Sequence, residues 1–189
     1  MPVIHDTTIL LPEGCACPEA AILLGNLGAI HDVIGRAVET LTPAQLQWQS
    51  MPVGNTIGML LAHIACAEVQ FIQMYVQGDK EEHIRDVLGI GFEEEGMPLE
   101  PGARPPAALA DKDVVYFAGL LAKALAHSSA ALRKLTLADF ERRTVIDRPN
   151  GDQRIFNLRW LLFHAVEHAA AHFGQIQTLK RLAGAAGIS

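Results

Sequence analysis

Hydrophobic residues recur at helical spacing in four stretches of the chain. Apolar positions separated by three and four residues form a stripe along one face of a helix, and polar residues fill the other face. This pattern predicts helices over about residues 18–41, 55–76, 112–135 and 157–182. Suitable N-caps stand near three of the starts: Asn55 or Thr56, Asp111, and Asn157. Four helices of about 20 residues each are typical of an all-α four-helix bundle.

The connection between the second and third predicted helices, residues 77–110, differs from the rest of the chain. It contains glycines, four prolines and the run Glu93-Glu94-Glu95. A connection of this length is usually either functional or mobile. Two interpretations follow from the sequence: a solvated crossover, or a lid over a site.

A turn signal stands before the fourth predicted helix. Residues 145–147 and 154–156 have strand character and flank Asn150-Gly151, a dipeptide that favours tight turns. The segment is either a small hairpin or an irregular loop.

Composition indicates one well-packed domain, residues 1–189, because half of the residues are hydrophobic and only 19% are charged. The net charge is −6, and the segment 79–113 alone has ten acidic and four basic residues, a difference of −6. The remaining acids and bases balance, and no basic patch is present. We therefore expect no nucleic-acid partner.

The N-terminus and the cysteines indicate a cytoplasmic protein. The first residues lack the basic start and apolar run of a signal peptide. The uncharged run 20–31 is too short, and too broken by glycine, to span a bilayer, so we expect no membrane association. Three cysteines do not form a disulfide framework, and the lone pair Cys15 and Cys17 is better interpreted as reduced thiols than as a metal motif.

Three histidines stand at four-residue intervals in the last predicted helix: His164, His168 and His172. Imidazoles at positions i and i+4 share a helix face and can hold one metal ion together. The outer two are separated by about 12 Å of helix rise, too far to share an ion. Hence the pair is either His164/His168 or His168/His172, and the alternative to both is a solvated histidine face.

A further histidine, His63, lies in an apolar stretch of the second predicted helix. Alone it is best interpreted as a hydrogen-bonded core histidine. Together with the other three it predicts a site of three histidines between two helices, because metal binding satisfies a buried imidazole. Such a site leaves coordination positions open, as in catalytic metal centres.

Three neighbouring residues are candidates for supporting roles. Cys66 follows His63 by three residues and could face the same side, although packing is the better interpretation. Glu68 and Glu167 are candidates for acid–base work or for supporting a metal ligand. Glu167 lies about 100° around the helix from His168, so we do not expect it to bind the ion directly. The default interpretation of both glutamates is a solvated or ion-paired side chain.

Residues 55–68 (NTIGMLLAHIACAE) and 164–176 (HAVEHAAAHFGQI) resemble the DinB-like (YfiT-like) superfamily of bacterial four-helix bundles, and residues 41–46 add to the likeness. The resemblance implies one divalent metal ion, zinc, nickel, iron or manganese, bound by His63, His168 and His172. It leaves His164 as a neighbour of the site. Many relatives have arginine where this chain has Phe173, so any role of that arginine is in doubt here.

The resemblance also implies an activity, because several relatives transfer low-molecular-weight thiols to small electrophiles or use them in isomerisation. We therefore expect a metal-dependent thiol S-transferase, with a hydrolase as the other enzyme class. A different class of function is a non-catalytic, metal-binding stress-response bundle in which the ion is structural. A metal-free bundle acting through dimer contacts is a third possibility. Relatives are often dimers, and Gly25, Gly28 and Gly35 would allow close packing, so a homodimer is expected.

Overall fold

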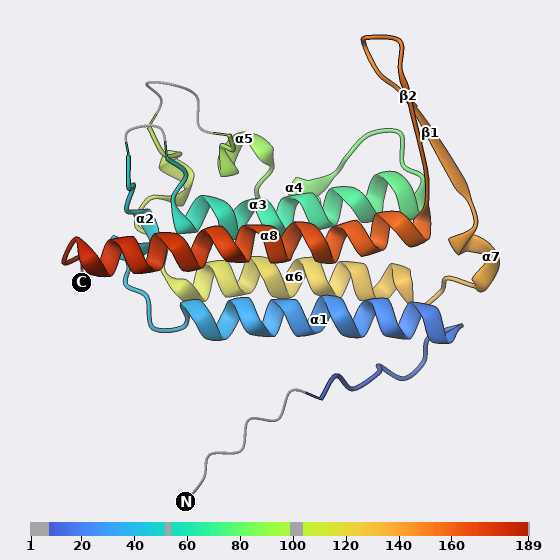
Figure 1. The fold of residues 1–189 in the computed structure, drawn as a ribbon, viewed down its shortest axis with the longest axis horizontal. Coiled ribbons are helices and arrows are strands. Elements are labelled where there is room, and N and C mark those ends of the chain that lie inside the picture. The colour runs from blue at the N-terminus through green and yellow to red at the C-terminus, as the bar shows by residue number, and fades with distance from the viewer. Residues whose placement is uncertain (1–7, 52–53, 99–103, 189) are drawn as a thin grey trace, which may run out of the picture.

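The protein is mostly helical, with one small two-stranded sheet (Figure 1). The computed structural model describes residues 8–51, 54–98 and 104–188. Four long helices lie side by side along the long axis: α1 (Pro18–Val38), α3 (Ile57–Phe71), α6 (Val114–Leu132) and α8 (Leu158–Ala185). Helix α3 packs on α6 and α8, and α1 packs on the same two helices. The four helical predictions are confirmed, with shifts of a few residues at their ends.

Side-chain caps explain where three of these helices begin. Thr56 accepts a hydrogen bond from the backbone of Met59, and Asn157 caps α8 in the same way. The cap of α6 is Asp113 rather than the predicted Asp111, whose φ of 57° places it in the left-handed region before the helix. Helix α3 continues through Gln77 as the π-helical turn η1 (Ile72–Gln77).

The segment before α8 forms a hairpin. Of the two interpretations of the turn signal, the hairpin is therefore confirmed and the irregular loop is wrong. Strands β1 (Arg143–Asp147) and β2 (Gln153–Asn157) are antiparallel, with Val145 opposite Ile155. The Arg148 backbone N–H closes the loop on the Asp152 carbonyl at 2.8 Å, and Gly151 takes the positive φ that the turn requires. Strand β2 runs directly into α8 and fixes where that helix starts.

The long connection is packed onto the bundle of helices, so the solvated-crossover interpretation is wrong for its described helical part. It folds into the short helices α4 (Ile84–Leu88), α5 (Phe92–Glu95) and η2 (Ala107–Leu109). Another short helix, α2 (Pro43–Gln47), precedes α3 in the chain. Its apolar side chains Ile84, Leu88, Ile90 and Leu109 join the core around α3. Helices α4 and α5 both contact α3, which places the acidic segment beside the helix that carries His63.

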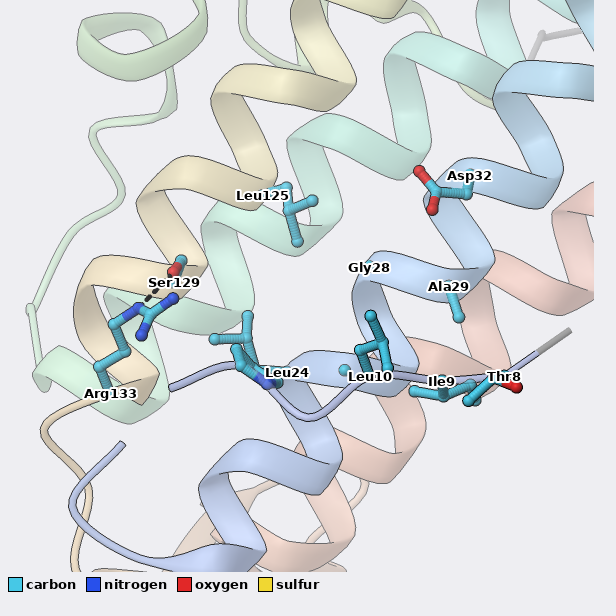
Figure 2. A pocket seen from close by; sticks show the side chains of 12 residues that line it. Thr8, Ile9, Leu10, Leu24, Gly28, Ala29, Asp32, Leu125, Ser129 and Arg133 are labelled. Carbon is cyan, nitrogen blue, oxygen red and sulfur yellow. Dashed lines mark hydrogen bonds between the residues drawn. The ribbon is translucent and has the colours of Figure 1, made fainter. Parts of the chain in front are cut away.

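The chain before α1 lies along the groove between α1 and α6 (Figure 2). Together they line a cavity of about 410 Å³, with Leu24 and Asp32 on α1 and Leu125 and Ser129 on α6. A Cβ added at Gly25 would lie 3.2 Å from Ile9, whereas Gly28 and Gly35 have open space. Part of the surface that we expected to face a partner is therefore covered by the chain itself, and the homodimer stays a prediction.

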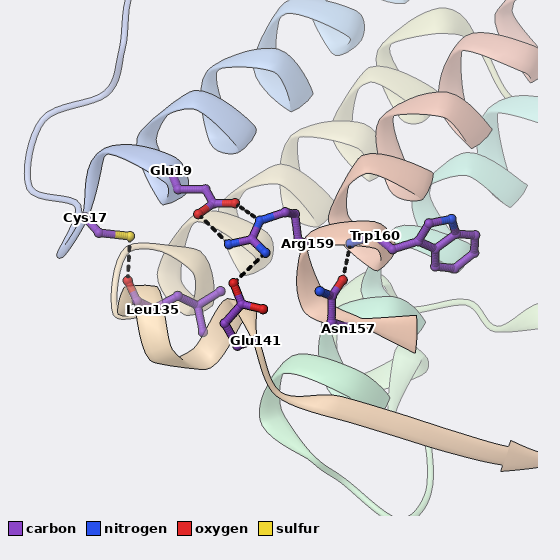
Figure 3. Close-up of polar contacts among 7 residues, drawn as sticks. All are labelled: Cys17, Glu19, Leu135, Glu141, Asn157, Arg159 and Trp160. Carbon is purple, nitrogen blue, oxygen red and sulfur yellow. Dashed lines mark hydrogen bonds and ion pairs between the residues drawn. The ribbon is translucent and has the colours of Figure 1, made fainter. Parts of the chain in front are cut away.

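Ion pairs join three elements at the end of the molecule where α8 begins (Figure 3). The Arg159 guanidinium contacts Glu19 of α1 at 2.5 Å and Glu141, which follows the short helix α7 (Leu137–Phe140), at 2.7 Å. The Cys17 thiol donates to the Leu135 carbonyl at 3.3 Å, and all three cysteines are free thiols. These exposed ion pairs orient the elements more than they stabilise them.

Within the part of the chain that the structure describes, three helical stretches are long and apolar enough to cross a membrane if only length and composition are considered: Pro18–Val38, Ile57–Gln77 and Val114–Leu132. In the most apolar 18-residue part of Ile57–Gln77, 78% of the residues are buried, compared with 39% in Pro18–Val38 and 28% in Val114–Leu132. The apolar stretch of α1, Pro18–Val38, is therefore longer than the uncharged run 20–31 from which the sequence prediction was made. The absence of membrane association stays a prediction.

Candidate metal centre

Helices α3 and α8 bring His63, His168 and His172 together. The Nε2 atom of His168 lies 3.2 Å from Nε2 of His63 and 3.1 Å from Nε2 of His172. One ligand atom from each residue lies within 4.8 Å of the other two. Of the two pairs that helical spacing left open, the structure brings His168/His172 to His63.

The spacing of these nitrogens fits a metal ion. Two imidazole nitrogens on a tetrahedral ion, each at about 2.0–2.1 Å, lie about 3.4 Å apart. Burial, followed by the neighbouring histidines His172, His63 and His164, lowers the pKa of His168 to about 3. Burial also lowers the pKa of His172. The imidazoles of His168 and His172 are therefore neutral at pH 7, with lone pairs available, and the three clustered residues could hold a metal ion.

A buried carboxylate orients His63. The Nδ1–H group of His63 donates to Oε1 of Glu95 at 3.0 Å, and the Glu95 side chain is fully buried. Because a carboxylate only accepts, this contact holds the proton on Nδ1 and leaves Nε2 free to face the other two histidines. The second oxygen, Oε2, is buried without a hydrogen-bond partner among the described residues.

Sequence reasoning missed Glu95, although one signal was present. Glu95 follows Phe92 by three residues, so the two share a face of α5, and Phe92 is the apolar residue of that turn. The Phe92 ring lies 6.2 Å from the His63 ring. Of the three glutamates in the run, Glu95 alone is fully buried.

A side-chain amide orients His172 in the same way. Its Nδ1–H group donates to Oε1 of Gln175 at 2.9 Å, one turn further along α8. Gln175 lies in the stretch that resembles the DinB-like superfamily, but the sequence alone gave it no role. His63 and His172 thus each donate from Nδ1 to an acceptor, and this hydrogen bond directs the Nε2 atom of each toward His168.

The remaining histidine of the series, His164, lies beside the cluster and outside it. Its Nδ1 contacts the exposed Glu167 at 3.1 Å. Its ring stacks on Trp160 with centroids 4.8 Å apart and an interplanar angle of 16°. The His168 ring is 6.1 Å away, and Phe71 lies against both rings. His164 and Glu167 therefore border the site, and neither hydrogen-bonds to the three clustered histidines.

The structure gives the two other candidates, Cys66 and Glu68, no contact with the clustered histidines among those it records. Cys66 is fully buried, and this burial raises the pKa of its thiol to about 12. Glu68 lies between α1 and α6, where it accepts from Nε2 of His31 at 2.7 Å and from the Ser128 hydroxyl at 2.6 Å. Cys66 is thus a packing residue, and Glu68 belongs to a buried polar network that the sequence did not predict.

Comparison with known proteins agrees with this geometry. A search of curated proteins found no match. Residues 22–183 match the model of the mycothiol-S-transferase (MST) family. This region contains all four long helices apart from the first residues of α1 and the last residues of α8. The match spans His63, His168 and His172. The chain therefore belongs to the mycothiol-S-transferase family, within the DinB/YfiT-like metal-dependent superfamily.

Proposed function

We propose that the protein is a metal-dependent thiol S-transferase with a DinB-like four-helix-bundle fold, and that His63, His168 and His172 bind its divalent ion. The observation that carries the proposal is the convergence of three histidines, each with one ligand nitrogen within 4.8 Å of the other two. A set of three protein ligands leaves coordination positions open for a substrate, as in catalytic centres. Membership of the mycothiol-S-transferase family supports the thiol chemistry.

The nucleophile in this proposal is the sulfur of a low-molecular-weight thiol. A divalent ion at the histidines would lower the pKa of a thiol that binds there, so that it reacts as a thiolate at neutral pH. The protein's own thiol near the centre, Cys66, has a pKa of about 12 and stays protonated. Glu95 and Gln175 would hold the imidazoles in place through their Nδ1 hydrogen bonds. The family name points to mycothiol as the thiol.

Elemental analysis coupled to a thiol panel tests the proposal. Protein purified without chelators should contain about one transition-metal ion per chain. With mycothiol, bacillithiol or glutathione and 1-chloro-2,4-dinitrobenzene, one of the thiols should give a metal-dependent rate. His168→Ala should abolish both metal binding and the rate. His164→Ala, on the same helix but outside the cluster, is the matched control and should retain the metal. Full metal content in His63→Ala or His168→Ala would exclude this site.

A second function remains in the proposal: a non-catalytic metal-binding protein in which the ion is structural. One observation favours it, since an ion there would join α3 and α8 through residues 105 positions apart in the chain. A structural ion predicts a large fall in melting temperature on chelation and no thiol-dependent turnover. The proposed working state is a cytoplasmic homodimer, which gel filtration and localisation of the tagged protein would test.

A further inference from the structure

A groove of about 490 Å³ lies along the part of α8 that follows the histidine cluster toward the C-terminal end of the helix. One wall is the exposed face of α8, and the other consists of residues 50–51 and 54–55 with one side chain of α3. The residues that line it are Ser50, Met51, Gly54, Asn55, Leu60, Ala171, Gly174, Gln175, Thr178, Leu179 and Leu182. The α8 residues stand at positions 171, 174, 175, 178, 179 and 182, so they share one side of the helix, and His168 stands beside that side.

Two residues connect the groove to the cluster. Gln175 lines the groove, and its Oε1 accepts the hydrogen bond from Nδ1 of His172 at 2.9 Å. Leu60 lines it as well, and lies one helical turn before His63 on α3. A molecule in this groove would therefore have one end beside the clustered histidines.

Among the residues that the structure describes, none with a charged side chain lines the groove. Its polar groups are hydroxyls and amides, from Ser50, Asn55, Gln175 and Thr178, and the rest is apolar. Moving an ionised group out of water into such surroundings is costly unless a counter-charge meets it. The groove thus favours an uncharged ligand.

The other flank of the cluster has the opposite character. A cavity of about 450 Å³ at the start of α8 is lined by Arg143, Arg154 and Trp160. The Arg154 guanidinium lies 4.4 Å from the centre of a Trp160 ring, and Trp160 stacks on His164. An anionic ligand would be drawn to this end rather than to the groove. The two ends of the site can therefore be distinguished by the charge of the ligand.

We propose that the groove binds the electrophilic substrate, and that this substrate is an uncharged, largely apolar molecule. This inference rests on the proposed S-transferase activity. With a chlorinated aromatic acceptor, the thiolate sulfur forms a bond to the ring carbon that carries chlorine. The carbon–chlorine bond then breaks, chloride leaves with the bonding electrons, and the thiol proton passes to solvent.

Gly174→Leu fills the groove, and Gly184→Leu is its matched control. Both glycines lie in α8, and a Cβ at either position meets nothing within 4 Å, so both variants should fold. Only Gly174 lines the groove. For the neutral acceptor 4-chloro-3,5-dinitrobenzamide we expect Gly174→Leu to raise KM by roughly ten-fold or more. KM for the thiol and the metal content should not change, and Gly184→Leu should behave as the wild type.

The charge of the acceptor provides an independent readout. Relative to the uncatalysed rates, the amide should be used at least about ten-fold better than 4-chloro-3,5-dinitrobenzoate, and Gly174→Lys should narrow that ratio. Preference for the benzoate, an unchanged KM in Gly174→Leu, or a rise in KM for the thiol instead would overturn the proposal.

Binding without turnover separates this inference from the proposed function. Saturation-transfer NMR with 4-chloro-3,5-dinitrobenzamide and zinc-loaded protein, without thiol, reports the groove alone. Binding that is lost in Gly174→Leu and kept in Gly184→Leu supports the groove even if no thiol is transferred. Absence of binding to the wild type would overturn the groove assignment whatever the outcome of the transferase assay.

Discussion

Replacing Glu95 tests whether the packed connection between α3 and α6 supports the histidine cluster. The Glu95 side chain is fully buried, and its Oε1 lies 3.0 Å from Nδ1 of His63. Removing it in Glu95→Ala leaves the His63 Nδ1–H group without its acceptor. The Nε2 atom of His63 would then no longer be held toward His168, so metal affinity should fall.

The size of the effect follows from the burial of this contact. A buried donor that loses its acceptor costs about 1–3 kcal/mol, and supporting residues of this kind typically change metal affinity about 10–100-fold. Glu95→Gln keeps an acceptor oxygen but loses the charge. The difference between a charge-assisted and a neutral hydrogen bond is about 1 kcal/mol, which corresponds to about a five-fold loss of affinity.

Competition with a chromophoric chelator measures the zinc affinity of each variant, and the absorption spectrum of the cobalt-loaded protein reports the ligand geometry. Glu93→Gln is the matched control, because Glu93 is an exposed neighbour in the same helix. Circular dichroism establishes that each variant is folded. Wild-type affinity in a folded Glu95→Ala protein would refute the positioning role, as would an equal loss in Glu93→Gln.

Three further measurements follow from the structure. Burial raises the Cys66 pKa to about 12, so its thiol stays protonated at pH 8. Iodoacetamide at that pH should label the partly exposed Cys15 in native protein but not Cys66. Fast labelling of Cys66 would contradict its burial. Glu68→Ala removes the acceptor of two buried groups and should lower the free energy of unfolding in urea by about 3–5 kcal/mol, whereas the exposed Glu167→Ala should change it little. Chelation of a catalytic ion should abolish turnover and lower the melting temperature by only a few degrees, because a shift of about 2–4 °C corresponds to about 1 kcal/mol in a chain of this size. A fall of about 10 °C or more, in a protein that shows no turnover, would favour the structural ion.

Much of the helical framework could be predicted from periodicity, because α3, α6 and α8 bury stripes that recur at helical spacing and begin at side-chain caps. The cap of α6 was misplaced by two residues because Asp111 and Asp113 are both good caps. The structure distinguishes them, because Asp111 has a left-handed backbone conformation whereas the Asp113 side chain accepts from the Tyr116 backbone N–H. The sequence before α8 is compatible with both a hairpin and an irregular loop, because a turn dipeptide does not by itself fix a strand register.

The site was predictable where local geometry determines it and unpredictable where tertiary contacts do. Four-residue spacing limited the pair on α8 to two choices, and the packing of α3 against α8 selects His168 and His172. The three-residue spacing from Phe92 places Glu95 on the apolar side of α5 but does not predict its contact with His63, because that contact depends on how α5 docks on α3. The same holds for Glu68, whose position in α3 gave no sign of the contacts it makes with α1 and α6.

The exposed face of α8 has a consequence for how proteins of this design can diversify. Ala171, Gly174, Thr178 and Leu182 line the groove from the outside of the helix, while Ala165, Ala169, Ile176 and Ala183 bury its opposite side. On α8 these four groove positions are therefore separate from the positions that the helix buries in the core. Substitutions at the outer positions can alter which molecules are accepted at little cost in stability, so one stable scaffold could give rise to many specificities.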